Sequence, residues 1–211
     1  MQIKKEYIRK QIANAAKGLY LQNGFIKTSM RDIADKAGVS VSNLYNYFEN
    51  KNELFGYIVS PLIKEMEQIL RDHNNARYNE QFLQFSNGEN NEMMPEHMKV
   101  YIKLIANHQD ELRLILFKAQ GSAWENYIDE YTDKCTRQVI EFMNNFKRQH
   151  PHIGMVCTPF TYHVHTVWMF SFISEIIKHN LSLKETEWAL ADYIRFEYDV
   201  WRLIMNNMEG S

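Results

Sequence analysis

The fold is decided by the stretch TSMRDIADKAGVSVSNLYNYFENKNELF, residues 28–55. Apolar residues recur there at helical spacing in two short runs, namely Met30, Ile33, Ala34 and Ala37, then Val41, Leu44, Tyr45 and Phe48. Gly38 can supply the left-handed backbone of a tight turn, and Ser40 can cap the helix that follows. We therefore expect two short helices joined by a steep turn, with both apolar runs facing inward.

A third helix precedes this pair. Ile8, Ile12, Ala15, Ala16 and Leu19 lie on one face of a helix predicted over 4–22, which stops at Asn23-Gly24. Thr28 or Ser29 can cap the next helix. Ser42, Asn43, Asn46 and Tyr47 are left on an outer edge that carries no acid, which suits contact with DNA bases and phosphates. The alternative is an ordinary three-helix unit with a solvated polar face.

The same stretch resembles the DNA-binding signature of the tetracycline-repressor (TetR/AcrR) family, roughly T-x-x-x-I-A-x-x-A-G-V-S-x-G-x-L-Y-x-H/Y-F-x-x-K-x-x-L. The similarity covers about the first 55 residues, including Tyr20 and Gly24-Phe25 in and after the lead helix. Two departures are Ser42, where Gly is common, and Asn43, where Thr is frequent. They leave the operator sequence open.

The resemblance implies roles for individual residues. Thr28 is implied to cap the second helix and touch phosphate, and Tyr45 to pack with its hydroxyl reaching the DNA backbone. Tyr47 and Lys51 are implied to contact phosphate, the latter at the positive end of the fourth helix. The predicted DNA-binding residues are Thr28, Ser29, Ser40, Val41, Ser42, Asn43, Tyr45, Asn46, Tyr47 and Lys51, of which Val41, Ser42, Asn43 and Asn46 stand where the family reads bases.

Composition and charge agree with this organisation. The 211 residues include only 8 Gly and 4 Pro, which favours an all-α fold of about nine helices over a many-stranded one. Residues 1–51 hold nine Lys and Arg against four Asp and Glu, whereas the rest of the chain is acidic. A basic N-terminal segment is typical of proteins that bind the phosphates of nucleic acid. We expect a DNA-binding domain over 1–51 and a helical ligand-binding and dimerisation domain over 52–211.

The remaining helices are predicted from periodicity and caps. A long fourth helix over 51–72 contains Pro61, where a kink or break is expected. At most a short helix near 80–85 interrupts a polar connection, and further helices are expected over 95–107 and 110–117. Ser122 can cap a long helix to 150, and two final helices are expected over 158–179 and 183–207.

The last two helices are apolar over more than one stripe, which favours a two-fold partner chain over a thicker monomeric core. The predicted dimer interface is Phe160, Val164, Val167, Ser171, Ile194, Tyr198, Trp201 and Met205. Aromatic residues of the middle helices can line a cavity for a small apolar or flat ligand, although such residues also build cores. The candidate pocket residues are Tyr101, Phe117, Trp124, Tyr127, Tyr131, His163 and Trp168.

Other chemistry is not indicated. His163 and His165 point to different sides of a helix, and no phosphate loop, zinc-protease or hydrolase motif occurs, so we expect no metal, cofactor or enzymatic activity. No export signal or membrane span is expected. Two cysteines are too few for a disulfide framework, which favours the reducing cytoplasm. The resemblance implies a homodimeric repressor that a small effector releases from a near-palindromic DNA operator. The alternatives are a helical adaptor with a non-functional helix-turn-helix and an enzyme of unfamiliar design.

Overall fold

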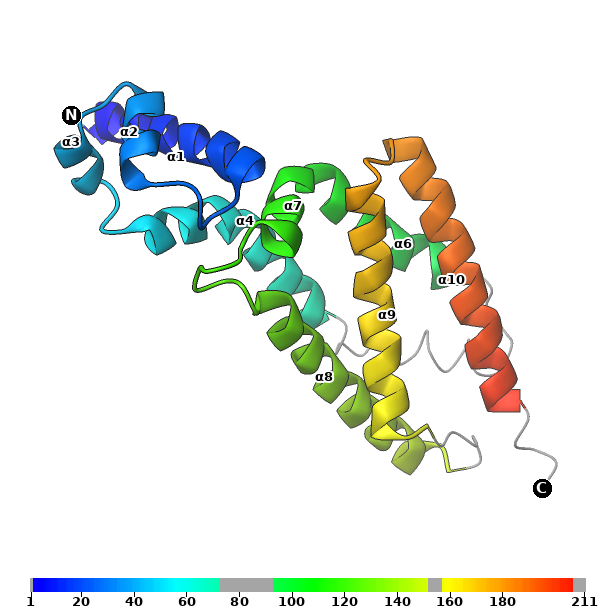
Figure 1. Cartoon of the computed structure of the whole chain (residues 1–211). Helices are drawn as coiled ribbons and strands as arrows, with labels where there is room; N and C mark the ends of the chain where they lie inside the picture. The colour runs from blue at the N-terminus through cyan, green and yellow to red at the C-terminus, as the bar shows by residue number, and fades with distance from the viewer. Residues whose placement is uncertain (1, 73–92, 152–156, 207–211) are drawn as a thin grey trace. The chain divides into compact units, whose positions relative to one another are not determined.

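The computed structural model describes residues 2–72, 93–151 and 157–206, with side chains described over 5–72, 99–151 and 157–196. These residues form nine helices and no strand, which confirms the predicted all-α fold (Figure 1). The chain divides into two compact units, Met1–Lys64 with His108–Ile128 and Glu65–Asn107 with Asp129–Ser211. The functional division after residue 51 stays a prediction, but the first compact unit extends past it and includes a second stretch of chain.

The first unit consists of α1 (Gln2–Asn23), α2 (Met30–Ala37), α3 (Val41–Tyr45), most of α4 (Lys51–Asp72) and α7 (Gln109–Phe117). Helix α1 packs against both α2 and α7, and α2 packs against α3. An aromatic cluster lies in its core, because Tyr20 stacks on Phe25 with ring centroids 5.8 Å apart and Phe55 meets both rings edge-on. This cluster joins α1, the connection that follows it, and α4.

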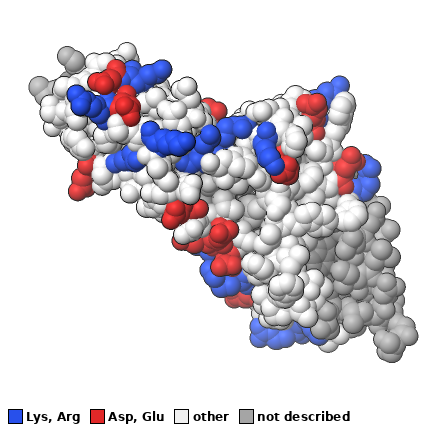
Figure 2. Space-filling model, viewed as in Figure 1, with Lys and Arg blue, Asp and Glu red and all other residues white. Residues whose placement is uncertain are grey.

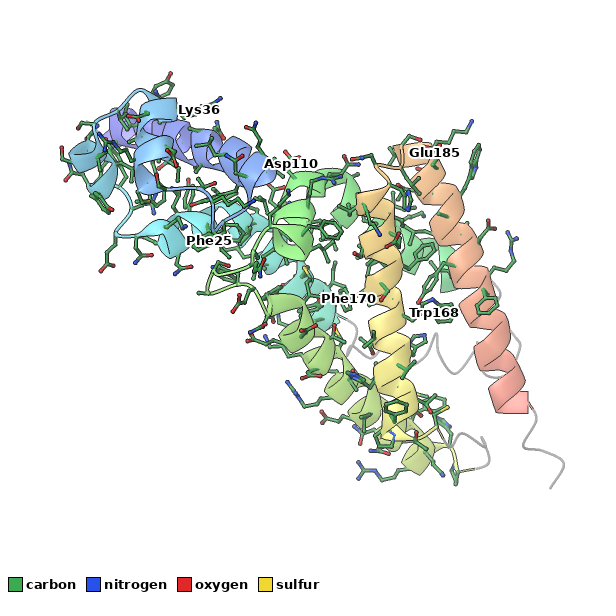
Figure 3. All side chains as sticks on the ribbon, in the orientation of Figure 1. Phe25, Lys36, Asp110, Trp168, Phe170 and Glu185 are labelled. Atoms are coloured by element: carbon green, nitrogen blue, oxygen red, sulfur yellow. The ribbon has the colours of Figure 1, made fainter. Side chains whose placement is uncertain are left out.

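The second unit consists of the end of α4, α6 (Met93–Asn107), most of α8 (Tyr127–Gln149), α9 (Pro159–Lys178) and α10 (Leu183–Asn206). Helices α6 and α10 lie against each other. Tyr131 of α8 donates a hydrogen bond of 2.6 Å to the Met66 carbonyl and meets Phe170 of α9 edge-on. Figure 3 shows Phe170 on the α8 side of α9 and Trp168 on the α10 side. Helix α9 is therefore held from two sides within this unit.

Two expectations about helix boundaries, a break at Pro61 and a cap at Ser122, were wrong, and the kink that was the other expectation at Pro61 stays a prediction. Helix α4 is not broken at Pro61, and Pro61 is exposed, so water can replace the hydrogen bond that its missing N–H would donate. Ser122 does not cap α8, which begins at Tyr127. The Ser122 hydroxyl instead accepts the Trp124 N–H at 3.0 Å within a series of turns. Thr158 caps α9 as expected, and the possible helix near 80–85 lies outside the described residues.

Candidate DNA-binding interface

Helix α2 begins at a complete capping box. The Ser29 hydroxyl oxygen accepts the Asp32 N–H at 3.1 Å, and the Asp32 carboxylate accepts the Ser29 N–H at 2.9 Å. Hydrogen bonds from the Ser29 hydroxyl and N–H, with some help from Arg31, lower the pKa of Asp32. The implied capping role of Thr28 was wrong, because its side chain is only 1% exposed and its hydroxyl donates to the Gly24 carbonyl at 2.8 Å.

The turn between α2 and α3 is fixed at both ends. Gly38 has φ 66°, a left-handed conformation that side chains disfavour, and its N–H donates to carbonyls in the last turn of α2. Ser40 then caps α3, since its hydroxyl oxygen accepts the Asn43 N–H at 3.1 Å. The direction of α3 relative to α2 is therefore set by local hydrogen bonds, as the sequence predicts.

Helix α3 is short, and this changes which of its side chains are buried. Leu44 and Phe48 are buried as predicted, but Val41 is 36% exposed and Tyr45 is 50% exposed, so the prediction that they face inward was wrong. The reason is that α3 spans only five residues, which cannot sustain a helical apolar stripe. Leu44 alone anchors the helix from within.

The outer surface of α3 is consequently wider and more apolar than the sequence suggested. Ser42 and Asn46 are exposed beside Val41 and Tyr45, while Asn43 and Tyr47 are half-buried. No acidic side chain occurs between residues 39 and 48. On the face shown in Figure 2, Lys and Arg lie among acidic side chains over the region of α1–α4. An amide, hydroxyls and apolar groups thus share one accessible edge, the combination that base edges and thymine methyl groups accept.

Lys51 is used inside the unit. Its ammonium donates to the carbonyls of Phe25 and Thr28 at 2.8 and 2.9 Å and lies 4.0 Å from the centre of the Phe25 ring. Partial burial lowers the pKa of Lys51. The residue that was implied to bind phosphate therefore also joins the start of α4 to the connection between α1 and α2.

A second cation, missed in the sequence, joins α1 to the region after α3. The Arg9 guanidinium lies 5.0 Å from the ring centre of Phe48 and 4.7 Å from that of Tyr57, and 3.8 Å from the Glu53 carboxylate. Phe48 and Tyr57 meet edge-on. An arginine beside the apolar stripe of a helix carries no distinctive sequence signal, because its partners lie about forty to fifty residues later. Arg9 and Lys51 together fix α4 against the first helix and its following turn.

Two short helices, joined by a left-handed glycine and held on a third, constitute a helix-turn-helix module, the class of fold that places one helix in the major groove of DNA. Residues 12–58 match the model of the family described as bacterial regulatory proteins, tetR family. This match over residues 12–58 agrees with the resemblance that the sequence predicted.

The relatives that the chain matches in sequence are similar over a segment of about 60 residues. It is 40% identical over 60 residues to the HTH-type transcriptional regulator YhgD of Bacillus subtilis, covering 28% of this chain and 31% of the relative. It is 39% identical over 61 residues to the HTH-type transcriptional repressor KstR of Rhodococcus jostii, covering 29% and 27%. The matched segment thus spans less than a third of either relative.

The fold is shared over a greater length. The structure of MexZ from Pseudomonas aeruginosa matches with a TM-score of 0.62 at 16% identity, covering 97% of this chain and 98% of that one. At this identity the similarity concerns the fold alone. Outside the helix-turn-helix region, the function of this chain must be argued from its own residues.

The candidate pocket residues fall into both compact units. Phe117, Trp124 and Tyr127 belong to the first unit, where the Trp124 and Tyr127 rings are in contact at 5.8 Å. The other four, Tyr101, Tyr131, His163 and Trp168, belong to the second. Tyr131 is buried against Phe170, and Trp168 meets Tyr193 and Phe196 of α10 edge-on. His163 lies 3.9 Å from the Asp133 carboxylate. Their role in ligand binding stays a prediction.

The predicted dimer residues on α9 lie on one exposed face. Phe160 is 73% exposed, Val164 is 47% exposed, Val167 is 41% exposed, and Ser171 is also exposed. Their spacing of four, three and four residues keeps them on one side of the helix, and Tyr162, Thr166 and Phe170 are buried on the other. Ile194 is half-buried. The side chains of Tyr198, Trp201 and Met205 lie outside the described residues.

Two searches of the described part of the chain gave negative results. It contains no group of three or more His, Cys, Asp or Glu side chains placed to hold a metal ion. None of its helices combines the length and the apolar character that crossing a membrane requires. Neither result bears on the residues outside the described ranges.

Proposed function

We propose that this protein is a sequence-specific DNA-binding transcriptional regulator that acts as a repressor in the cytoplasm. The observation that carries the proposal is the exposed, acid-free edge of α3, presented by a turn whose two ends are fixed by Gly38 and Ser40. A rigid helix with amide and hydroxyl groups toward solvent is suited to the major groove. KstR, which is similar to this chain over 61 residues, is named a repressor, which favours repression.

The residues of the module divide by what they can touch. Val41, Ser42, Asn43 and Asn46 are proposed to contact bases, since they lie on or beside the exposed edge of α3. Ser29, Ser40, Tyr45, Tyr47 and Lys51 are proposed to lie near phosphate. Thr28 stays in the predicted set, but it is buried and its N–H and carbonyl are bonded to Phe25 and Lys51. Contacts to phosphate position the module, and contacts to bases select the sequence.

We propose that the molecule acts as a two-fold homodimer. The exposed face of α9 formed by Phe160, Val164, Val167 and Ser171 is largely apolar, and a second copy would cover it. Tyr198, Trp201 and Met205 of α10 complete the proposed interface from sequence. A two-fold pair presents two α3 helices to half-sites about 34 Å apart, so the operator is a near-palindrome.

We further propose that a small effector binds the domain over 52–211 and lowers DNA affinity. The aromatic residues of the second unit, Tyr101, Tyr131, His163 and Trp168, supply apolar surface with a few polar groups, as small-molecule sites do. Phe117, Trp124 and Tyr127 also remain predicted pocket residues. An effector acts only through its different affinity for two conformations, and a coupling of about 1–3 kcal/mol makes a usable switch.

The experiment is a salt titration of binding to the DNA upstream of the protein's own gene, followed by fluorescence anisotropy. A regulator is expected to bind this DNA more tightly than random DNA of equal length, with affinity that falls steeply as salt rises. Asn43→Ala is expected to cost about 1–3 kcal/mol at the preferred site and little on random DNA. Asn14→Ala is the matched control, since Asn14 is an exposed asparagine on α1.

The alternative adaptor function makes the opposite prediction. An adaptor with a non-functional helix-turn-helix forms no complex with upstream DNA even at low salt, and Asn43→Ala then has no effect. A transcription assay on the bound promoter distinguishes repression from activation, because a repressor lowers the transcript level in proportion to occupancy.

A further inference from the structure

The helix proposed for the major groove carries no charged side chain. Residues 37–48, from the last residue of α2 through α3 to Phe48, contain no Lys, Arg, Asp or Glu. In the major groove, the commonest specific contact to guanine is a bidentate hydrogen bond from Arg or Lys, and Asp or Glu accepts a hydrogen bond from cytosine. Neither contact can come from α3, so this helix must read bases with uncharged groups.

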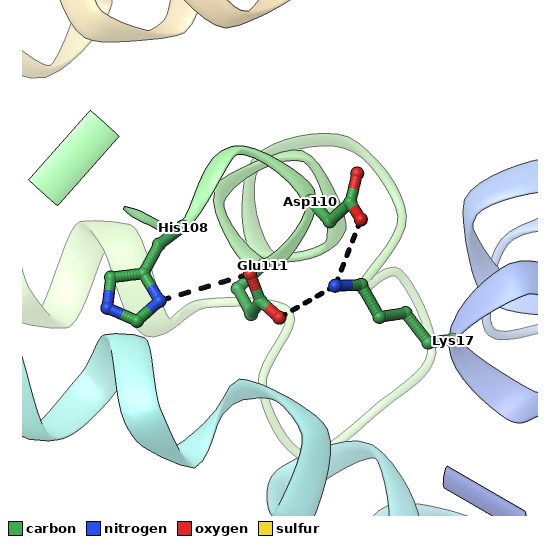
Figure 4. Close-up of polar contacts among 4 residues, drawn as sticks. All are labelled: Lys17, His108, Asp110 and Glu111. Carbon is green, nitrogen blue, oxygen red and sulfur yellow. Dashed lines mark hydrogen bonds and ion pairs between the residues drawn. The ribbon is translucent and has the colours of Figure 1, made fainter. Parts of the chain in front are cut away.

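Three cations of the first unit already have partners inside it. The Lys17 ammonium lies 2.9 Å from the carboxylates of both Asp110 and Glu111 (Figure 4). The Lys51 ammonium donates to two backbone carbonyls, and the Arg9 guanidinium lies over two aromatic rings. The exposed cations of α2 belong to the helix that crosses the phosphate backbone in a helix-turn-helix complex, which suits them to phosphate. Base readout in the major groove therefore falls to α3.

The exposed residues of α3 form one continuous edge. The helical backbone extends past Tyr45, because Asn46 has right-handed helical dihedral angles and its N–H donates to carbonyls in the last turn of α3. At about 100° per residue, Val41, Tyr45, Ser42 and Asn46 follow one another within an arc of about 140°. The fully buried Leu44 lies outside this arc. The edge is therefore apolar over one half and polar over the other.

The apolar half of the edge is suited to thymine. Val41 is 36% exposed and Tyr45 is 50% exposed, and a spacing of four residues makes their side chains neighbours on the helix surface. Thymine is the base that presents an apolar group in the major groove, its C5-methyl. Burial of a methyl group against Val41 removes apolar surface of both partners from water. The Tyr45 hydroxyl can still reach phosphate while its ring lies beside Val41.

The polar half of the edge is suited to adenine. Asn46 is exposed, and none of the described residues is hydrogen bonded to its side-chain amide. An asparagine amide offers one acceptor and two donors, which match the N6 donor and N7 acceptor of adenine. The Ser42 hydroxyl lies 3.2 Å from that of Ser40, and serine accepts either partner, so it discriminates little between bases.

We propose that α3 selects A·T base pairs in each half-site of the operator, with Val41 against a thymine methyl group and Asn46 on an adenine edge. The proposal rests on the DNA-binding function proposed above and names the base pairs that this function requires. Val41 and Asn46 lie at opposite ends of the exposed edge, so we expect them to contact different base pairs. Each half-site is therefore expected to contain at least two A·T pairs.

The test begins with selection of binding sites from a pool of random duplex DNA by the full-length protein. The enriched sequences are expected to contain inverted half-sites that share at least two A·T pairs. Each shared thymine is then replaced by deoxyuridine, which lacks only the C5-methyl group, and affinity is measured by fluorescence anisotropy at one salt concentration. Replacement at one position of each half-site is expected to weaken binding about fourfold, the effect of one buried methyl group.

Two variants assign these contacts to residues. Val41→Ala is expected to weaken binding to the thymine site and to reduce the effect of deoxyuridine to less than about twofold. Val100→Ala is the matched control, because Val100 is a valine of α6 that is 37% exposed, and it is expected to keep the full effect. In the wild-type protein, 7-deazaadenine, which lacks the N7 acceptor, is expected to weaken binding about tenfold at one position, and Asn46→Ala is expected to abolish this loss.

The outcomes distinguish the inference from the proposed function. Enriched half-sites whose shared pairs are G·C would overturn the inference and leave the DNA-binding function intact. An operator on which no deoxyuridine replacement lowers affinity would do the same, and so would a loss that persists unchanged in Val41→Ala. A pool in which no sequence is enriched would overturn the proposed function and the inference together.

Discussion

Substitution of Lys51 by methionine separates two roles that one residue can play. The structure places its ammonium between the carbonyls of Phe25 and Thr28 and over the Phe25 ring. The resemblance to the TetR family implies a contact with DNA phosphate. Lys51→Met keeps most of the apolar length of the side chain and removes the charge, so it tests which role dominates.

The expected loss of stability follows from these contacts. A hydrogen bond from a charged group contributes about 1.5–3 kcal/mol, and a cation over a ring about 0.5–1 kcal/mol at exposed sites. The Lys51 side chain is only half-buried, and water can reach the carbonyls that the substitution frees. We therefore expect Lys51→Met to lower the free energy of unfolding by about 2 kcal/mol in total. In a chain of this size, this corresponds to a Tm lowered by about 4–8 °C.

The assay combines thermal unfolding with a salt titration of DNA binding. Each phosphate neutralised by a protein cation contributes about 0.9 to the slope of log Kobs against log salt concentration. If Lys51 acts inside the unit, Lys51→Met lowers Tm and leaves this slope unchanged. Lys64→Met controls for loss of a lysine from the same helix, and Arg31→Met, at the exposed start of α2, is expected to reduce the slope. A slope reduced by about 0.9 per protomer with Tm unchanged would refute the reasoning.

Three further perturbations probe the Ser29 cap, the backbone at Gly121 and the ion pairs of Lys17. Ser29→Ala removes the hydroxyl of the capping box and is expected to lower the free energy of unfolding by about 1 kcal/mol in urea titrations, whereas an unchanged midpoint would show that the box is not formed. Gly121→Ala is expected to cost about 1–2 kcal/mol, since Gly121 has φ 80° and an added Cβ meets Ile26; a neutral result in calorimetry would contradict this backbone conformation. The folded pKa of Lys17 is raised above the ordinary value of 10.5, so its contribution to stability is fully present below pH 10.5 and is lost as pH rises through the higher folded pKa. Unfolding measured across that alkaline range is expected to show a steeper loss for the wild-type protein than for Lys17→Met, and parallel curves would argue against the ion pair.

Much of the helix-turn-helix could be predicted because its determinants are local. Gly38 and Ser40 each act on neighbours within four residues, and the structure places both as the sequence indicated. The orientation of Tyr45 was not predictable, since a periodic pattern assumes a helix long enough to repeat and α3 ends after five residues. Thr28 and Ser29 both suited the cap position by type, and only the burial of Thr28 decides between them.

Residues 108–126, which comprise α7 and the turns that follow it, show a different limit. The contacts of this segment with Phe25 and Asn52 use the Lys118 carbonyl, a group that every residue has, and the Ala123 N–H, which every residue except proline has, so the side chains at 118 and 123 carry no signal. Lys17 and Glu111 lie 94 residues apart in sequence, and a surface lysine facing an acidic helix start is common in any helical protein. Packing between distant segments is the part of the site that required the structure.

The discontinuity of the first unit has a consequence for the newly made protein. Residues 108–128 leave the ribosome only after the whole of 65–107, so the module that binds DNA cannot gain its last supporting contacts until a stretch assigned to the other unit has been synthesised. A nascent chain that stalls before residue 108 carries all of α1, α2 and α3, yet Phe25 lacks its Lys118 partner and Lys17 lacks both of its carboxylates. Completion of the unit that holds the helix-turn-helix is thereby tied to translation of more than half of the polypeptide.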